Sequence, residues 1–484
     1  MIHCSTVEER VSLVSQMLSK PTHGLISQWS RAHHVSRQTL YRWATKGRQA
    51  LSAAFEAPQV PPKPKSPHVF LVLTLLLETH ASYRGIQTCL REMHGLHLSL
   101  GTIAGIVKEA GSRAQNWLKQ QQAPTARTLA LDEQYSSQRG KAYLNVIDVH
   151  SGQVWATVPP VAVDGESWTL LLWYLSEQGI ETKGTVSDGG RAIAEAVTQV
   201  YGSTHHQRDI WHLLHLASQV QARLDRAVSM EQERLPAIQR NAERASAGKA
   251  PKGRPSGVTL AQQQARIAQM QYVAQSVNYL CQHVRRMVEV VVVHQGRLLS
   301  SQERQGEIEA ALDLLDELAP LATTVMQKQI QMLSKHLRLA LPQTLLFARE
   351  LDARNLHAVR CLGSEAVALL AWAWRRRTVL GPSSTHLLKA IPSAWRKEAA
   401  MLLKAWDQAV RASSVVENWH SIVRPHLAVH RTLSAGFLAL LAVWHNHRIA
   451  PRGLHEDLSP LQRTGSASSD HTWLAALGYS ALAA

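Results

Sequence analysis

The sequence predicts a multidomain protein in which all-α N-terminal modules precede an α/β domain that an all-α insertion interrupts. At 484 residues the chain is too long for one core, because single cores stop growing at about 250 to 300 residues. Helical periodicity dominates up to residue 122 and again over 216–405, whereas short runs within 123–215 alternate with period two. The pattern therefore predicts an α/β layer between two helical regions.

The charge balance points to a polyanionic partner. Lys and Arg number 52 against 36 Asp and Glu, which gives a net charge of +16, and nucleic acid is the default polyanion for such a chain. No membrane partner is expected, because there is no run of about 18 apolar residues and the N-terminus lacks a signal-peptide pattern. A cytoplasmic protein is predicted. The four cysteines are far apart without a Cys-x-x-Cys pair, which predicts neither disulfides nor a cysteine-based zinc site.

Residues 1–56 are predicted to form a helix-turn-helix DNA-binding module. Leu25 and Trp29 begin one helix, a polar turn follows, and Ser36 can cap a second helix in which Leu40 and Trp43 face inward. The alternative is an ordinary helical hairpin. On the second helix the side chains predicted to face DNA are Arg37, Gln38, Thr39, Tyr41 and Arg42.

A Pro-rich linker over 57–68 marks a domain boundary, because its prolines favour an extended spacer. Residues 69–122 then repeat the helical design, with Ser99 placed to cap the last helix. We predict a second helix-turn-helix-like DNA-binding module, with Thr102 and Lys108 toward DNA.

Residues 123–215 predict the first part of the α/β domain. Three strand-like runs separated by turns fit a meander, and a helix, a fourth strand, a second helix and a short final strand follow. The expected strands cover 128–135, 141–152, 153–161, 184–190 and 204–211, and the expected helices cover 164–179 and 191–202.

The helical insertion, 216–405, contains a basic Gly/Pro/Ser-rich segment at 240–257 that we expect to be a mobile linker. Its Lys249, Lys252 and Arg254 could contact phosphates or be solvated. Residues 288–294, "VEVVVVH", are expected to be a buried helix segment. The second part of the α/β domain is expected over 406–450, followed by a C-terminal tail, 451–484.

Three separated acids carry the predicted chemistry. Asp132 lies inside an alternating strand, where an unpaired carboxylate is costly to bury. Asp188 ends the fourth strand in "TVSDGG", and Glu417 lies among apolar residues on a helix. The alternative for each Asp is a helix or turn cap. Three converging carboxylates are what two-metal phosphoryl transfer requires.

Asp132, Asp188 and Glu417, in this order of strands, resemble the acidic triad of the DDE transposases of bacterial insertion sequences, which have an RNase H-like catalytic domain. "RDIWHLLH" resembles the (C/D)xxH signature of the Mutator-like and related families through Asp209 and His212. The Glu-bearing helix, a later "N-x-R" and an "SPLQ" tail extend the resemblance to roughly residues 125–465.

The resemblance implies an enzyme that binds the inverted-repeat ends of its mobile element, cleaves them and joins the 3′-hydroxyls to target DNA. It implies two Mg²⁺ ions held by the three acids, with Mn²⁺ able to substitute. The expected partners are double-stranded DNA and further copies of the chain, as a homodimer or higher homo-oligomer on DNA. The expected location is the bacterial cytoplasm, in association with the nucleoid.

Auxiliary roles are predicted for residues near the acids. Asp209 and His212 either shape the site or act as a helix cap and a core histidine. His420 and Arg424 share a helix face with Glu417 and could orient a phosphate or the 3′-hydroxyl, or lie on a solvated face.

Two rival functions stay open from the sequence. The first is a catalytically idle DNA-binding regulator derived from a transposase, and the second is an RNase H-like nuclease without strand joining. Trp211 and Trp419 could stack on a displaced base, although packing in a core is the more frequent role of tryptophan.

Overall fold

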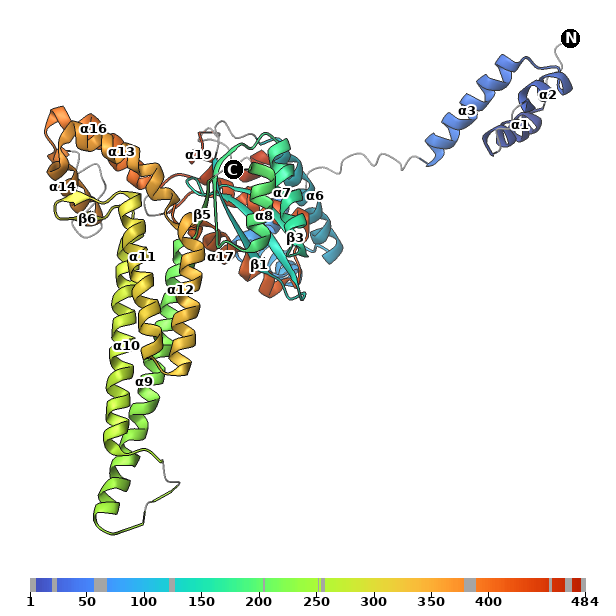
Figure 1. The fold of residues 1–484 in the computed structure, drawn as a ribbon. Coiled ribbons are helices and arrows are strands. Elements are labelled where there is room, and N and C mark those ends of the chain that lie inside the picture. The colour runs from blue at the N-terminus through green and yellow to red at the C-terminus, as the bar shows by residue number, and fades with distance from the viewer. Residues whose placement is uncertain are drawn as a thin grey trace. The chain divides into compact units, whose positions relative to one another are not determined.

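The computed structural model describes residues 6–19, 24–55, 68–121, 127–202, 205–250, 252–253, 257–377, 389–451, 455–465 and 472–479. The chain divides into two compact units, Met1–Pro67 and His68–Ala484, and Figure 1 labels many of their elements. Residues 57–67 of the predicted linker lie outside the described residues. Of the helices that are described, none is both long enough and apolar enough to cross a membrane.

The first unit consists of three helices, α1 (Val7–Ser19), α2 (Leu25–Ala32) and α3 (Arg37–Phe55). The Ser36 hydroxyl accepts a hydrogen bond from the Thr39 backbone N–H (3.1 Å) and so caps α3, as the sequence predicts. Leu40 is fully buried. The exposed side chains on the first turns of α3 are Arg37, Gln38, Tyr41 and Arg42, and Thr39 is half-buried.

The second unit is built around a five-stranded mixed sheet of order β3-β2-β1-β4-β5. Strands β1, β2 and β3 form an antiparallel meander, whereas β4 and β5 run parallel to β1. The strands are β1 (Arg127–Tyr135), β2 (Lys141–Asp148), β3 (Val154–Ala162), β4 (Thr182–Ser187) and β5 (His205–Arg208). The predicted order of elements over this segment is confirmed.

Alternation along the strands separates two cores. Leu129 and Leu131 face α7 (Gly165–Glu177) and α8 (Arg191–Tyr201), together with Trp168. On the other face, Ala130 shares a core with α17 (Ser414–Val429) and α18 (Ala435–His447).

Three more helices join this second core: α4 (His68–Glu78), α5 (Tyr83–His94) and α6 (Leu100–Lys119). Their fully buried leucines and isoleucines, such as Leu76 and Ile103, lie in the same cluster as Ala130. Residues 69–122 are therefore part of the same compact unit as the sheet. Thr102 and Lys108 are exposed on α6.

The insertion is a helical body with its own apolar core, in which α9 and α10 run as a long pair with α11 and α12 beside them (Figure 1). Its helices are α9 (Ile210–Ser246), α10 (Leu260–Met287), α11 (Ser301–Leu318), α12 (Thr324–Thr344), α13 (Leu346–Leu362), α14 (Ser364–Arg375) and α16 (Arg396–Asp407). The C-terminal tail adds α19 (Pro460–Arg463) and α20 (Trp473–Ala476).

Two local expectations for the insertion are wrong. Residues 240–246 are the last turns of α9 rather than part of a linker. Residues 288–294 are not helical: they lead into a hairpin of β6 (Val293–His294) and β7 (Arg297–Leu298). Gln295 and Gly296 both have positive φ, at 48° and 73°, which is the backbone of a two-residue turn that favours a hairpin over a continued helix.

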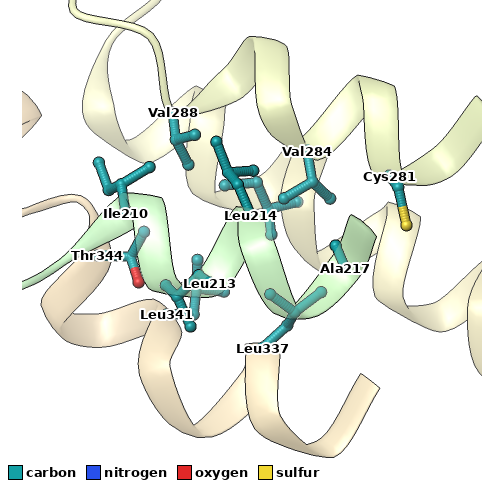
Figure 2. Close-up of a pocket in the computed structure, with 11 residues that line it drawn as sticks. Ile210, Leu213, Leu214, Ala217, Cys281, Val284, Val288, Leu337, Leu341 and Thr344 are labelled. Atoms are coloured by element: carbon teal, nitrogen blue, oxygen red, sulfur yellow. The ribbon is translucent and has the colours of Figure 1, made fainter. Parts of the chain in front are cut away.

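A small apolar cavity lies between α9, α10 and α12 (Figure 2). Its lining is aliphatic apart from the Cys281 thiol and the Thr344 hydroxyl, and that hydroxyl donates to the Ala340 carbonyl (2.8 Å). The cavity is therefore a packing feature of the insertion and has none of the converging polar groups that a catalytic site needs.

Helices α6 and α18 meet at a pair of glycines. A Cβ added at Gly111 would lie 2.7 Å from the carbonyl carbon and oxygen of Gly436, whereas a Cβ added at Gly436 would come no closer than 3.4 Å to Gly111. The two helix backbones can approach this closely only because Gly111 has no side chain.

Gly111→Ala should therefore destabilise the second unit by about 1 to 3 kcal/mol, the usual cost of overpacking a well-packed interface. Gly436→Ala is the matched control and should change stability by less than about 1 kcal/mol, because its methyl group meets only ordinary contacts. Urea unfolding of both variants measures the difference. Equal unfolding midpoints would show that the helices can separate at little cost.

Candidate active site

Asp132 lies on β1, and Asp188 comes directly after the neighbouring parallel strand β4. Ala130 on β1 pairs with Val186 on β4, and each Asp comes two residues after its paired residue. Because alternate residues share one face of a sheet and parallel strands are about 4.8 Å apart, both carboxylates lie on the face that α17 covers. The sheet thus brings together two of the three predicted acids.

Glu417 reaches this place from the first turn of α17. The buried side chains Val416, Trp419 and Val423 pack α17 against the same face of the sheet. Ligand atoms of Asp132, Glu417 and His420 lie within 4.8 Å of one another. The charge of Asp188 also acts on Asp132, so the three predicted acids lie in one region of the sheet although they are far apart in the chain.

The environment of Asp132 disfavours its negative charge. Burial raises the pKa of Asp132 to about 7, and repulsion from Asp188, Glu417 and Glu133 adds to this rise. A hydrogen bond from the Glu133 backbone N–H (2.8 Å) opposes it. In the described part of the chain, no Lys or Arg lies within ion-pair distance of Asp132. Asp132 is half-buried, and a carboxylate of raised pKa without a cationic partner is typical of functional sites.

Asp188 combines a structural and an electrostatic role. Its Oδ1 accepts a hydrogen bond from the Gly190 N–H (2.7 Å), where the chain turns into α8. Its charge also acts on Asp132 and on the half-buried Arg208. Arg208 Nη1 donates to the Gly189 carbonyl (2.7 Å), and a Cβ at Gly189 would overlap the guanidinium. The glycine therefore lets Arg208 approach the Asp188 turn.

A buried hydrogen-bond network orients His420 toward the acids. The Trp419 Nε1–H, which can only donate, bonds to Asn145 Oδ1 (3.0 Å), so Asn145 Nδ2 faces His420 Nε2 (3.1 Å). Nε2 must then accept, and the proton of the neutral ring lies on Nδ1, 4.0 Å from Glu417 Oε2. Burial lowers the pKa of His420 to about 4, although the Glu417 charge opposes this.

Sequence reasoning missed Asn145. Its signal was a single amide within the otherwise apolar run 142–147. Asn145 is fully buried, pairs with Asp132 across β1 and β2, and also accepts a hydrogen bond from the Thr157 hydroxyl (2.7 Å). Buried polar groups persist when they are fully bonded, and this one sets the tautomer of a histidine beside the acids.

Arg424 lies on the exposed side of the same helix. Its Nη2 is 3.3 Å from Glu417 Oε2, with 62% and 49% of the two side chains exposed. An ion pair this open to solvent contributes little to stability. Arg424 is therefore accessible to an anionic ligand beside Glu417.

Asp209 uses both of its carboxylate oxygens within the fold. Oδ1 accepts from the backbone N–H groups of Trp211 (2.7 Å) and His212 (3.4 Å) and so caps α9. Oδ2 accepts from the N–H (2.8 Å) and hydroxyl (2.6 Å) of Ser413. This arrangement favours the capping interpretation, in which Asp209 positions other elements.

The two tryptophans predicted as possible stacking partners of a base, Trp211 and Trp419, differ in exposure. Trp419 is fully buried, so it packs in the core and is not accessible to a base. Trp211 is 55% exposed, stacks on the His215 ring at 4.8 Å, and meets the half-buried His212 edge-on at 5.0 Å. Of these two tryptophans, only Trp211 has a ring that is accessible to solvent.

Other residues of interest lie away from the acids. Glu133 is on the opposite face of β1, where Oε1 accepts from Trp168 Nε1 (2.8 Å). Lys249 and Lys252 are exposed after the end of α9. Arg254 lies outside the described residues.

One stretch of this chain is similar to a protein of Lactococcus lactis subsp. lactis (strain IL1403) named "Transposase for insertion sequence element IS905". The two are 29% identical over 175 residues, which cover 34% of this chain and 44% of the relative. The match thus spans less than half of the relative's length. No protein-family model matches the chain.

The raised pKa of Asp132 predicts a pH-dependent stability of the metal-free protein. The folded state holds this proton more tightly than the unfolded state does, so the contribution is fully present below about pH 4 and is lost as the pH rises through 7. Asp132→Asn removes the charge and should raise the Tm at pH 8 by more than at pH 5. One pKa unit corresponds to about 1.4 kcal/mol, so a difference of several °C is expected in EDTA.

Glu177→Gln, which alters an exposed carboxylate on α7, is the control for this measurement. Its effect on the Tm should be the same at both pH values. The interpretation of Asp132 fails if the gain from Asp132→Asn is also independent of pH.

Proposed function

We propose that this protein is a DNA transposase of an insertion sequence, which cleaves the ends of its mobile element and joins the 3′-hydroxyls to target DNA. The observation that carries the proposal is that Asp132 and Glu417 lie close together and that the charge of Asp188 also acts on Asp132. A helical insertion separates the second acid from the third along the chain. The name of the Lactococcus relative supports the same function.

The sheet and its flanking helices form, in this proposal, an RNase H-like catalytic domain. Its support is the antiparallel meander β1-β2-β3 followed by the parallel strands β4 and β5, with helices on both faces. The first acid lies on β1 and the second directly after β4, as the resemblance to DDE transposases implies.

The acids fit a pair of divalent cations. Asp132, Asp188 and Glu417 would hold two Mg²⁺ ions, or Mn²⁺ in their place, since hard cations prefer carboxylate oxygens. The fit is supported by Asp132, whose raised pKa reflects burial and like charges that a bound cation would offset. When bound, such ions supply activation of the attacking oxygen and stabilisation of the leaving oxygen.

Residues beside the acids position the DNA. The exposed guanidinium of Arg424 can bind a phosphate next to Glu417, because Arg presents donors in a geometry that matches phosphate oxygens. His420 directs its Nδ1–H toward the same place; Asn145 orients that ring, and burial lowers its pKa to about 4, so the ring carries no positive charge at neutral pH. It can therefore donate a hydrogen bond to a substrate oxygen without competing for the cations.

DNA recognition is assigned to the exposed basic and polar side chains of α3, which would enter the major groove of the inverted repeats. Thr102 and Lys108 on α6, and Lys249 and Lys252 beyond α9, would contact further DNA. Cutting two ends in concert requires at least a homodimer on DNA, which is the state we propose.

The first experiment incubates the protein with Mg²⁺ and a labelled duplex carrying the DNA that flanks its own gene. Asp188→Asn and Asp132→Asn keep side-chain shape but remove a ligand charge, so cleavage and strand joining should fall at least about 100-fold while DNA binding persists. Glu133→Gln, on the opposite face of β1, is the matched control and should retain activity.

Each outcome distinguishes the candidates. If Asp188→Asn cuts as well as the wild type, Asp188 is only a turn cap and the triad is wrong. If the wild type binds DNA but never cuts, the idle-regulator interpretation replaces the transposase. Cleavage without joining would identify a nuclease.

A second experiment tests the α3 interface through the salt dependence of binding. Each phosphate contact contributes a slope of about −0.9 to a plot of log K against log salt concentration. Arg37→Ala and Arg42→Ala should each reduce the slope by about 1. Arg31→Ala is the control, because the Arg31 Nε–H on α2 is bonded to the Ser27 carbonyl (3.3 Å). Unchanged slopes for both α3 variants would exclude this face.

A further inference from the structure

A second cluster of ligand-type side chains lies in the insertion, on α13 and α16. His357 and Cys361 are four residues apart and share one face of α13, and Glu398 faces them from the first turn of α16. His357 and Cys361 are exposed, and the Glu398 side chain is 12% exposed. An imidazole, a thiol and a carboxylate from two helices thus meet at the protein surface.

The spacing of their atoms matches a tetrahedral metal site. Cys361 Sγ lies 3.6 Å from His357 Nε2, and His357 Nε2 lies 3.6 Å from Glu398 Oε2. A tetrahedral Zn²⁺ with its usual bond lengths holds a sulfur and a nitrogen ligand about 3.5 Å apart, and a nitrogen and an oxygen ligand about 3.3 Å apart. The three ligand atoms also lie within 4.8 Å of one another, so one ion can reach all of them with small side-chain movements.

The Glu398 carboxylate is already oriented for this role. Arg354 binds its Oε1 and also donates to the Glu398 backbone carbonyl (3.1 Å). The other oxygen, Oε2, is the one that faces His357. In metal sites, a carboxylate that binds the ion is often held in place by hydrogen bonds from neighbouring residues. Arg354 holds Glu398 in this way, and the other carboxylate oxygen stays directed at the two further ligands.

We propose that His357, Cys361 and Glu398 form a Zn²⁺ site with a fourth position open to water. Thiolate, imidazole and carboxylate together suit zinc better than Mg²⁺ or Ca²⁺. The ion would link α13 to α16, two helices that α14 and a further segment separate in the sequence. This site consists of residues other than the acid triad and does not depend on the proposed transposase function.

The test uses untagged full-length protein that has been stripped with a chelator and titrated with Co²⁺ and then Zn²⁺. One equivalent of Co²⁺ should give a sulfur-to-cobalt charge-transfer band and the visible bands of tetrahedral cobalt, and Zn²⁺ should displace it. Cys361→Ser should abolish the charge-transfer band. Cys361→Ser and His357→Gln should each weaken Zn²⁺ binding at least about 100-fold, above the usual effect of losing an outer partner.

Matched controls separate this cluster from other surface ligands. Cys89→Ser and His336→Gln alter a half-buried cysteine on α5 and an exposed histidine on α12, and both should bind as the wild type does. With Asp132→Asn and Asp188→Asn added to every protein to remove charges from the other proposed cation site, Zn²⁺ should raise the Tm of the proteins with an intact cluster but not of Cys361→Ser. A cobalt spectrum without the sulfur band, or a sulfur-to-cobalt band that survives Cys361→Ser, would overturn the proposal.

Discussion

The carboxylate of Asp209 holds together the elements on which the rest of the second unit depends: the sheet, the start of the helical insertion and the start of α17. It caps α9, where the insertion begins, and it binds Ser413, where the insertion ends. The Asp209 N–H also donates to the Ser187 carbonyl (2.7 Å), directly before Asp188. Hydrogen bonds to a charged group contribute about 1.5 to 3 kcal/mol each. One residue thereby fixes the entrance and exit of the insertion and the elements that carry two of the three acids.

Further contacts make the same junction rigid. The Ile210 N–H donates to the Arg411 carbonyl (3.0 Å), and the Gln207 side chain bonds the Thr344 carbonyl (2.9 Å) and the Phe347 N–H (3.0 Å). The insertion is therefore attached to the sheet by hydrogen bonds as well as by its two chain connections. The first helix of the insertion follows β5 and the last one precedes α17. A displacement of the insertion would therefore also move the helix that carries Glu417.

Local periodicity explains what could be predicted from the sequence. The strands, α7 and α8 follow from alternation and capping. Contacts distant in the chain could not be predicted: the core that α4–α6 share with the sheet, the Asn145–His420 bond, and the meeting of His357 with Glu398 all depend on tertiary packing. The hairpin after α10 was missed because a buried Val-rich run fits helix and strand equally well, and Gln295–Gly296 decided between them.

The close glycine contact between α6 and α18 has a geometric consequence. Helix α18 packs on β3 and lies in the same core as Ala130 and Val186, so α6 cannot shift relative to the acids without separating two backbones in contact. Any DNA held by Thr102 and Lys108 would then lie at a fixed number of base pairs from the reactive carboxylates. In the proposed transposase, the packing of α6 against α18 would therefore set the distance along the DNA between the bound sequence and the phosphate that is cut.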